Sequence, residues 1–365
     1  MSLSVGIVGL PNVGKSTLFT ALTKNEVLIA NYPFATIDPS VGVVAVPDAR
    51  LETLSKISGS SKIIPAIVEF VDIAGLVKGA STGEGLGNKF LSNIRETHMI
   101  AEVVRIFEDD AIHHVTGDIN PLEDIETINL ELILADVETV SKRLGNVERD
   151  VKRGDKTALV EKAVLERLLP HLESGKLAHA LTATKEEQNV LANLHLLTMK
   201  PFLYVCNKKQ GVYNFDEQSD PRWQELLHFF ESTNSEYVVV DAGMELELKD
   251  LSNDEKNEFR REYGAQDSGV ESLIRACYHR LGLMSYFTTG EKETRAWTVP
   301  IGSTGPEAGA AIHTDFHDKY IRAQVVTFED LAMAGSKAAA REQGKLRTEG
   351  KEYIVQDGDV IEFMV

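Results

Sequence analysis

A glycine-rich stretch close to the N-terminus has the residue types and the spacing of a loop that binds phosphate groups. It reads Gly-Leu-Pro-Asn-Val-Gly-Lys-Ser-Thr over residues 9–17, which fits the pattern G-x-x-x-x-G-K-[ST]. Gly9 and Gly14 allow the backbone to turn tightly, so successive N–H groups can point into a concavity that holds phosphate oxygens. In this pattern Lys15 contacts the β- and γ-phosphates, and the Ser16 hydroxyl ligates Mg²⁺. The stretch therefore predicts a site for a nucleoside triphosphate and Mg²⁺.

The elements on either side of this stretch are those that a phosphate-binding loop requires. Residues 3–8 form a short apolar run that predicts a β-strand, and residues 17–23 have the apolar spacing of a helix. A helix that starts here directs its positive N-terminal end at the same phosphate groups. A chance glycine-rich turn would rarely combine strand, helix, lysine and serine in this order.

Two further positions are candidates for contacts with Mg²⁺ and the γ-phosphate. Residues 31–39 are punctuated by proline and predict a loop that contains Thr36, about where switch GTPases keep a second Mg²⁺ ligand after Ser16. A loop threonine without a role is the alternative, which spacing alone leaves open. A predicted strand over residues 67–71 is followed at once by Asp72, the first residue of a D-x-x-G motif. Asp72 would hold Mg²⁺ through water, and the Gly75 N–H would meet the γ-phosphate.

The residue after the motif glycine bears on hydrolysis. Switch GTPases of the Ras type place a glutamine there, which orients the attacking water. This chain has Leu76, which can neither donate nor accept a hydrogen bond. We therefore expect slow intrinsic hydrolysis, or hydrolysis that depends on another group or a partner. Five glycines between positions 75 and 87 predict a segment that becomes ordered only with a ligand.

A later strand end supplies candidates for base recognition. GTPases carry N-K-x-D there, and its aspartate accepts hydrogen bonds from both N–H groups of guanine. This chain has Asn207-Lys208-Lys209-Gln210 after an apolar run. The Gln210 amide offers one acceptor and a donor that would oppose the donors of guanine. Loss of the charged acceptor costs about 1.5–3 kcal/mol, so the sequence predicts weak selectivity for guanine.

Composition and charge limit the classes of protein to which the chain can belong. Its 365 residues exceed one ordinary core, and a hydrophobic content of 43% is typical of soluble globular proteins. No run of 18 uncharged apolar residues predicts a membrane span, and two cysteines without metal-type spacing suggest a reducing compartment. We expect a cytoplasmic monomer. A net charge of −18 argues against electrostatic coating of free nucleic acid, so RNA contact would require a local basic patch.

Residues 121–200 predict a helical arm inserted into the nucleotide-binding domain. Steps of four and three residues, the heptad seam of a coiled coil, separate the apolar residues Ile133, Val137, Val140, Leu144, Val147 and Val151. A turn at 154–155 precedes a second predicted helix over 157–172. A capping box of Thr184 and Glu187 predicts a third helix, through Leu197.

The predicted tip of this arm is locally basic in an acidic chain. Basic residues outnumber the acidic ones there: Lys142, Arg143, Arg149, Lys152, Arg153 and Lys156. A solvated helical face is the simpler interpretation, and contact with RNA is the alternative.

From Leu283 the pattern changes to short strands and turns with one helix, which predicts a small α+β module.

Several motifs together resemble the YchF family, the Obg-like ATPases. They are G-L-P-N-V-G-K-S-T, N-Y-P-F-A-T-I-D-P, D-I-A-G-L-V-K-G-A-S-T-G-E-G-L-G-N-K-F, R-A-W-T-V-P-I-G and I-V-Q-D-G-D-V-I. The resemblance covers nearly the whole chain. It implies an α/β fold with a P-loop G domain on a mostly parallel sheet, formed by residues 1–120 and 201–281. It also implies a coiled-coil insertion over 121–200 and a C-terminal ubiquitin-like TGS domain over 282–365.

The resemblance also implies an activity and a set of site residues. It implies an ATPase that associates with ribosomes, with Leu76 in place of the catalytic glutamine and with Mg²⁺ bound by Ser16 and Thr36. Phosphate contacts would come from Asn12, Val13, Gly14, Lys15, Ser16 and Thr17. The family usually has N-x-x-E where this chain has Asn207 and Gln210, so this chain lacks the acidic side chain of the family at that position.

The hypothesis is a cytoplasmic, Mg²⁺-dependent P-loop nucleoside triphosphatase that prefers ATP over GTP and acts as a switch associated with the ribosome or its RNA. Lys15, Asp72 and Gly75 are the candidate catalytic residues. A GTP-hydrolysing translation factor and a binding switch with negligible hydrolysis are the alternatives.

Overall fold

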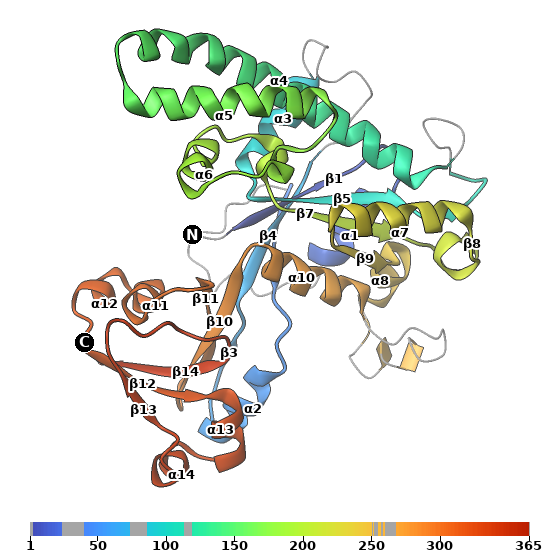
Figure 1. Cartoon of the computed structure of the whole chain (residues 1–365). Helices are drawn as coiled ribbons and strands as arrows, with labels where there is room; N and C mark the ends of the chain where they lie inside the picture. The colour runs from blue at the N-terminus through green and yellow to red at the C-terminus, as the bar shows by residue number, and fades with distance from the viewer. Residues whose placement is uncertain are drawn as a thin grey trace.

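The computed structural model describes residues 3–23, 40–73, 86–112, 119–249, 251, 255–256, 258–259 and 268–364. In these parts a six-stranded sheet lies at the centre of the molecule (Figure 1), with the strand order β2-β4-β1-β5-β7-β9. Its strands are β1 (Ser4–Val8), β2 (Val41–Ala45), β4 (Ile67–Asp72), β5 (Met99–Arg105), β7 (Phe202–Asn207) and β9 (Tyr237–Val240). All neighbours pair in parallel except β2 and β4. The prediction of a mostly parallel sheet is confirmed.

Helices cover both faces of this sheet, which explains the composition of its central strands. Every residue of β1, β5 and β7 is buried, as expected of near-continuous apolar runs in parallel sheets. On one face α1 (Lys15–Thr23) packs against α8 (Ala242–Leu248), and α8 packs against α10 (Gly269–Arg280). On the other face lie α3 (Leu86–Glu96), α4 (Pro121–Lys152) and α7 (Pro221–Thr233) (Figure 1). A short two-stranded antiparallel sheet of β6 (Phe107–Glu108) and β8 (Tyr213–Asn214) lies beside the main sheet.

Two helices form a long hairpin that projects from the sheet, α4 and α5 (Lys156–Glu173) (Figure 1). Asn120 begins α4, because its side chain accepts hydrogen bonds from the N–H groups of Leu122 and Glu123. The predicted seam is buried between the helices: Ile133, Val140 and Val147 lie in its core, and Val137, Leu144 and Val151 pack against that core. Of the described helices, none combines the length and apolar character needed to cross a membrane.

Two predicted helix ends are wrong. The helix α6 (Lys185–Ala192) begins at the predicted capping box of Thr184 and Glu187 but ends before Leu197. The Asp136 carboxylate accepts hydrogen bonds from the N–H groups of Leu197 and Thr198, at 2.9 and 2.8 Å, and so holds this segment in a separate turn. The sequence also predicts a helix over residues 88–100, but this helix, α3, ends at Glu96, because the residues from Met99 onward pair with β1 as strand β5.

The C-terminal module, residues 283–364, is built on a second sheet with the order β13-β12-β14-β10-β11-β3. Its own strands are β10 (Leu283–Thr289), β11 (Thr294–Pro300), β12 (Arg322–Thr327), β13 (Arg347–Glu349) and β14 (Asp359–Met364). The expectation of one helix is wrong, since the module contains α11 (Gly305–Ile312), α12 (Thr314–Asp318), α13 (Phe328–Ala334) and α14 (Lys337–Glu342).

The C-terminal sheet also contains a strand from elsewhere in the chain. Strand β3 (Ile63–Ile64) pairs in parallel with β11, and the preceding helix α2 (Arg50–Ser58) packs against β10, β11 and α13. Figure 1 shows both elements among the C-terminal strands. The C-terminal sheet is therefore not formed by residues 282–365 alone, as the sequence-based division assumed.

Candidate nucleotide-binding site

The loop between β1 and α1 lies at the carboxyl end of the sheet, where ligands bind in folds of this kind. Two of its glycines are required by the space around them. A Cβ atom on Gly9 would lie 2.6 Å from the Val103 carbonyl oxygen. A Cβ atom on Gly14, whose φ is +101°, would lie 2.2 Å from the Asn207 amide nitrogen. Other side chains would displace the loop from the sheet, so both glycines fix the position of the loop.

The Lys15 side chain is held inside this loop. It is 8% exposed, and its ammonium group donates a hydrogen bond to the Leu10 carbonyl oxygen at 2.7 Å. Burial lowers the pKa of Lys15 to about 8, and the nearby Asp72 carboxylate offsets part of this effect. A buried cation beside loop N–H groups favours an anionic ligand, because phosphate oxygens would restore the interactions that burial removes.

Ser16 and Asp72 supply two adjacent oxygen donors at the edge of the loop. The Ser16 hydroxyl donates to the Asp72 carboxylate at 3.4 Å. Backbone hydrogen bonds hold the end of β4 in place, from Asp72 N–H to the Ser40 carbonyl oxygen at 2.8 Å and from Ile73 N–H to the Ile7 carbonyl oxygen at 3.2 Å. A hydroxyl and a carboxylate next to a phosphate-binding loop are the ligand types that Mg²⁺ prefers. These residues fit a Mg²⁺–nucleotide complex.

Other predicted site residues are placed only in part. Asn12, Val13 and Thr17 lie in the loop or the first turn of α1, with Asn12 at a φ of +65°. Thr36 and Gly75 lie outside the described residues, as does Leu76, so their roles stay predictions.

Asn207 connects the phosphate-binding loop with the loops that follow β7 and β9. Its side chain is 5% exposed, and its amide nitrogen donates to the Val13 carbonyl oxygen at 2.9 Å. Its amide oxygen accepts from the Ala242 N–H at 3.1 Å. Sequence reasoning treated Asn207 as a contact to the ligand and missed this link, which no local pattern indicates.

Gln210 lies close to the same edge, but its side chain is exposed. Its backbone N–H donates to the Asp241 carboxylate at 2.7 Å, and the other carboxylate oxygen accepts from the Met244 N–H at 2.9 Å to begin α8. The lysines before it are also anchored: Lys208 pairs with Glu217 at 2.8 Å, and Lys209 pairs with Asp109. Sequence reasoning missed Asp109 as a partner, because it lies 100 positions away.

A phosphate-binding loop after the first strand of a mostly parallel sheet, with an acid at the end of the neighbouring strand, defines a P-loop protein of the GTPase fold class. Comparison with known proteins agrees. A family model described as "50S ribosome-binding GTPase" matches residues 4–141. A second model, YchF-GTPase_C, described as "Protein of unknown function (DUF933)", matches residues 283–365.

Relatives of similar length identify the family within this class of P-loop proteins. The chain is 52% identical to the ribosome-binding ATPase YchF of Bacillus subtilis, with 100% of this chain and 99% of that protein covered. It is 48% identical to the protein of the same name from Escherichia coli O157:H7, with the same coverage. The solved structure of the Schizosaccharomyces pombe YchF GTPase superposes with a TM-score of 0.89 at 35% identity, over 100% of this chain and 98% of that one. The chain belongs to the YchF family.

Proposed function

We propose that this chain is a Mg²⁺-dependent ATPase of the cytoplasm that binds ribosomes and changes its affinity for them with its nucleotide state. The observation that carries the proposal is the buried Lys15 ammonium inside a loop that joins β1 to α1, beside the Ser16 and Asp72 oxygens. Relatives that are 52% and 48% identical over their whole length are named ribosome-binding ATPases. Hydrolysis of GTP and a binding switch without hydrolysis are the alternatives.

Each predicted site residue has a role in this proposal. The loop N–H groups from Asn12 to Thr17 and the Lys15 ammonium would hold the phosphates, while Ser16 and Thr36 would ligate Mg²⁺. Asp72 would hold the metal through water, and the Gly75 N–H would orient the γ-phosphate. Bound Mg²⁺ would neutralise charge that develops on the phosphate oxygens. Leu76 cannot orient water by hydrogen bonding, so this role falls to another group or to the partner.

We propose the domain division expected from the sequence, except that residues 50–64 belong to the C-terminal module. Residues 1–120 and 201–281 would form the nucleotide domain, 121–200 a coiled-coil arm, and 282–365 a ubiquitin-like TGS domain. The pairing of β3 with β11 supports assigning residues 50–64 to the C-terminal module. We propose a monomer as the working state.

The central experiment is co-sedimentation of the full chain with ribosomes in the presence of MgATP, MgADP or no nucleotide, paired with titrations of ATP and GTP. We expect tight ATP binding and ribosome binding that differs between nucleotide states. Equal sedimentation in all three conditions would contradict the switch, and a strong preference for GTP would contradict the ATPase.

Gln210→Asp is expected to improve the affinity for GTP relative to ATP. An aspartate would accept hydrogen bonds from both N–H groups of guanine, and the charged acceptor is worth about 1.5–3 kcal/mol, or roughly 10- to 150-fold. The Gln210 side chain is exposed, and its backbone N–H is fixed by Asp241, so the substitution should leave the loop in place. Calorimetric titration of both nucleotides measures the ratio. An unchanged ratio would remove Gln210 from base recognition without touching the ATPase assignment.

Charge reversal at the arm tip tests the RNA contact. Lys142, Arg149 and Lys152 are exposed, and changing all three to Glu should weaken ribosome binding. The slope of the logarithm of the binding constant against the logarithm of salt concentration should become shallower by about one unit for each phosphate contact that is lost. A matched control reverses Lys176, Lys185 and Arg275, which are exposed away from the tip. Co-sedimentation across a salt series measures both variants. Equal behaviour of the two would favour a solvated helical face.

A further inference from the structure

The segment that connects two strands of the six-stranded sheet packs against the C-terminal module. Strand β2 ends at Ala45 and β4 begins at Ile67, and between them the chain forms α2 and β3. We call residues 46–66 the excursion. Strand β2 follows the predicted Thr36 loop, and β4 leads to the D-x-x-G motif. The excursion therefore connects the two segments that we predict to contact Mg²⁺ and the γ-phosphate.

Backbone hydrogen bonds tie the excursion to the β10–β11 hairpin. The Ser61 N–H donates to the Glu291 carbonyl oxygen, and the Thr294 N–H donates to the Lys62 carbonyl oxygen, each at 2.9 Å. The Ser60 hydroxyl donates to the Gly290 carbonyl oxygen at 2.7 Å. These contacts make β3 the edge strand of the C-terminal sheet rather than a neighbouring surface loop.

Arg50, the first residue of α2, adds a side-chain connection. Its guanidinium pairs with Asp357 at 2.7 Å and with Asp48 of the excursion, and it lies 4.9 Å from the centre of the Phe287 ring. A Cβ atom on Gly358 would lie 3.0 Å from the guanidinium, so the glycine allows this close approach. Because the guanidinium has charged partners on both sides, its removal breaks a contact between the excursion and the module.

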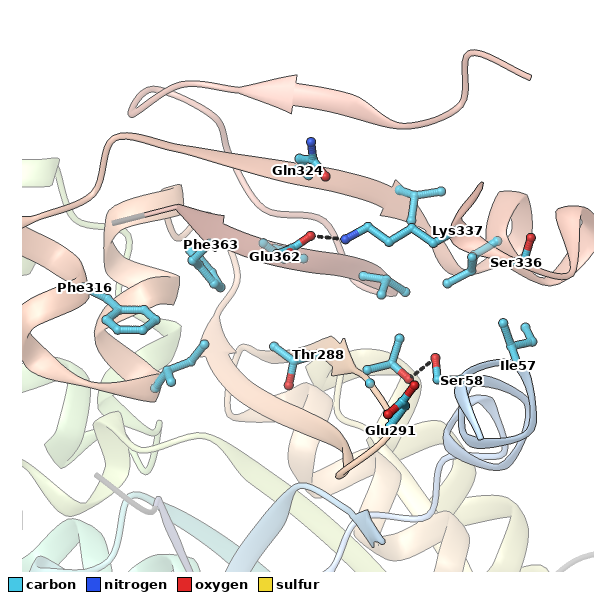
Figure 2. Close-up of a pocket in the computed structure, with 17 residues that line it drawn as sticks. Ile57, Ser58, Thr288, Glu291, Phe316, Gln324, Ser336, Lys337, Glu362 and Phe363 are labelled. Carbon is cyan, nitrogen blue, oxygen red and sulfur yellow. Dashed lines mark hydrogen bonds and ion pairs between the residues drawn. The ribbon is translucent and has the colours of Figure 1, made fainter. Parts of the chain in front are cut away.

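The other end of α2 forms part of a cavity of about 470 Å³ in the C-terminal module (Figure 2). Ile57 and Ser58 line one side, and the rest is lined by residues of β10, β12 and β14, of the β10–β11 turn and of the helical segments α11 to α14. The Thr289 hydroxyl donates to the Ser58 hydroxyl at 2.8 Å, at the end of the cavity where Figure 2 shows Ser58 beside the hairpin. A displacement of the excursion would change the shape of this cavity.

Strand β4 connects the excursion to the phosphate-binding loop. From Ile64 to Asp72 the chain is nearly continuous extended structure, and its eight residue-to-residue steps span about 26 Å at roughly 3.3 Å per step. Strand β4 is hydrogen-bonded to β1 on one side and β2 on the other, which makes it stiff. At its far end the Asp72 carboxylate accepts from the Ser16 hydroxyl.

We propose that the excursion couples the nucleotide site to the C-terminal module, with Arg50 as a positioning residue at the contact between them. The inference rests on the proposed function, since it concerns regulation of the same nucleotide site. Coupling between two sites is reciprocal. If exchange of ADP for ATP shifts the conformational equilibrium of the module by some factor, then a substitution that abolishes this coupling changes the ratio of the ATP and ADP affinities by up to that factor.

Hydrogen exchange of the full chain with MgADP and with Mg²⁺ and a non-hydrolysable ATP analogue tests the coupling. We expect protection of peptides over residues 9–17 with both ligands, and exchange over 288–295 that differs between them. In Arg50→Ala the difference over 288–295 should fall at least about threefold, and the ratio of the two affinities should shift by about fivefold or more. Ser60→Ala, which keeps Arg50, should reduce the difference in the same direction.

Two controls separate this route from others. Arg347→Ala removes an arginine that pairs with Glu349 and Asp359 inside the module, and it should leave the difference intact. Tyr278→Phe removes a hydroxyl through which α10 contacts Met284 and Ser285, a second connection to the module, and it should also leave the difference intact.

The outcomes separate the coupling from the proposed function. Protection over 9–17 with identical exchange over 288–295 in both nucleotide states overturns the coupling and leaves the ATPase assignment standing. If both Arg50→Ala and Ser60→Ala keep the full wild-type difference in exchange over 288–295 between the nucleotide states, the excursion is not the route of coupling. Absence of protection over 9–17 with either nucleotide overturns the proposed function, and the coupling with it.

Discussion

Lys15→Ala should weaken MgATP binding by a factor of about 30 to several thousand, while the folded protein keeps its stability or gains some. Removal of one partner from a buried charged contact costs about 2–5 kcal/mol. The Lys15 ammonium is 8% exposed and sits among the loop groups that would surround the phosphates. Its hydrogen bond to Leu10 is local to the loop, so the core of the sheet does not depend on it.

The expected effect on stability follows from the pKa of Lys15. Burial lowers this pKa from 10.5 to about 8, so the folded state binds the proton more weakly than the unfolded state does. The cost of the buried charge is therefore fully present below pH 8, and it disappears as the pH rises from about 8 to 10.5. In the absence of nucleotide, Lys15→Ala should be at least as stable as the wild type at pH 7, because loss of the hydrogen bond to Leu10 offsets part of the relief of the buried charge.

The same pKa predicts proton uptake when nucleotide binds. Phosphate oxygens beside Lys15 would favour its charged form, so at pH 8 wild-type binding should take up a fraction of a proton, and affinity should fall at higher pH. Calorimetry in two buffers of different ionisation enthalpy measures this uptake. Lys200→Ala is the matched control, because Lys200 is also a partly buried lysine with a lowered pKa, and it precedes β7 at the opposite end of the sheet. Wild-type ATP affinity in Lys15→Ala would refute the phosphate site.

Local patterns predicted the parts of the site that the chain forms from consecutive residues. The loop at 9–17 is recorded in its own residues and in the strand and helix on either side, and the seam of α4 is recorded in its heptad spacing. Both could therefore be predicted, although distant residues such as Asn207 and the α5 core also hold them in place. The mostly parallel sheet follows from the buried apolar runs at β1, β5 and β7.

Features that depend on distant partners were missed. Strand β3 has two residues, too few for any periodicity, and it is a strand only because β11 lies beside it more than 200 positions later. The end of α6 depends on Asp136, whose carboxylate holds a turn about 60 positions away. Sequence spacing carries no record of such contacts, so neither the division of domains nor this helix end could be derived from it.

The link made by Asn207 is another long-range feature, and its removal should have a large effect. Asn207→Ala would leave the buried Val13 carbonyl oxygen and the buried Ala242 N–H without the partners that they now have. A buried polar group without a partner costs about 1–3 kcal/mol, so the loss in stability should be about 2–4 kcal/mol after local relaxation. The phosphate-binding loop should also lose its fixed position against β7, which lowers ATP affinity together with stability.

Two further variants distinguish a specific link from general loss of a polar side chain. Asn207→Asp keeps an acceptor for the Ala242 N–H but places a second oxygen against the Val13 carbonyl oxygen, where the amide now donates at 2.9 Å. Two acceptors at that distance repel, so Asn207→Asp should be at least as destabilising as Asn207→Ala, although it is closer to the original shape. Asn193→Ala is the control, since its exposed amide donates to the Asn189 carbonyl oxygen within the same turn. Thermal unfolding with and without MgATP measures all three, and an Asn207→Asp variant as stable as the wild type would mean that the amide donor to Val13 contributes nothing.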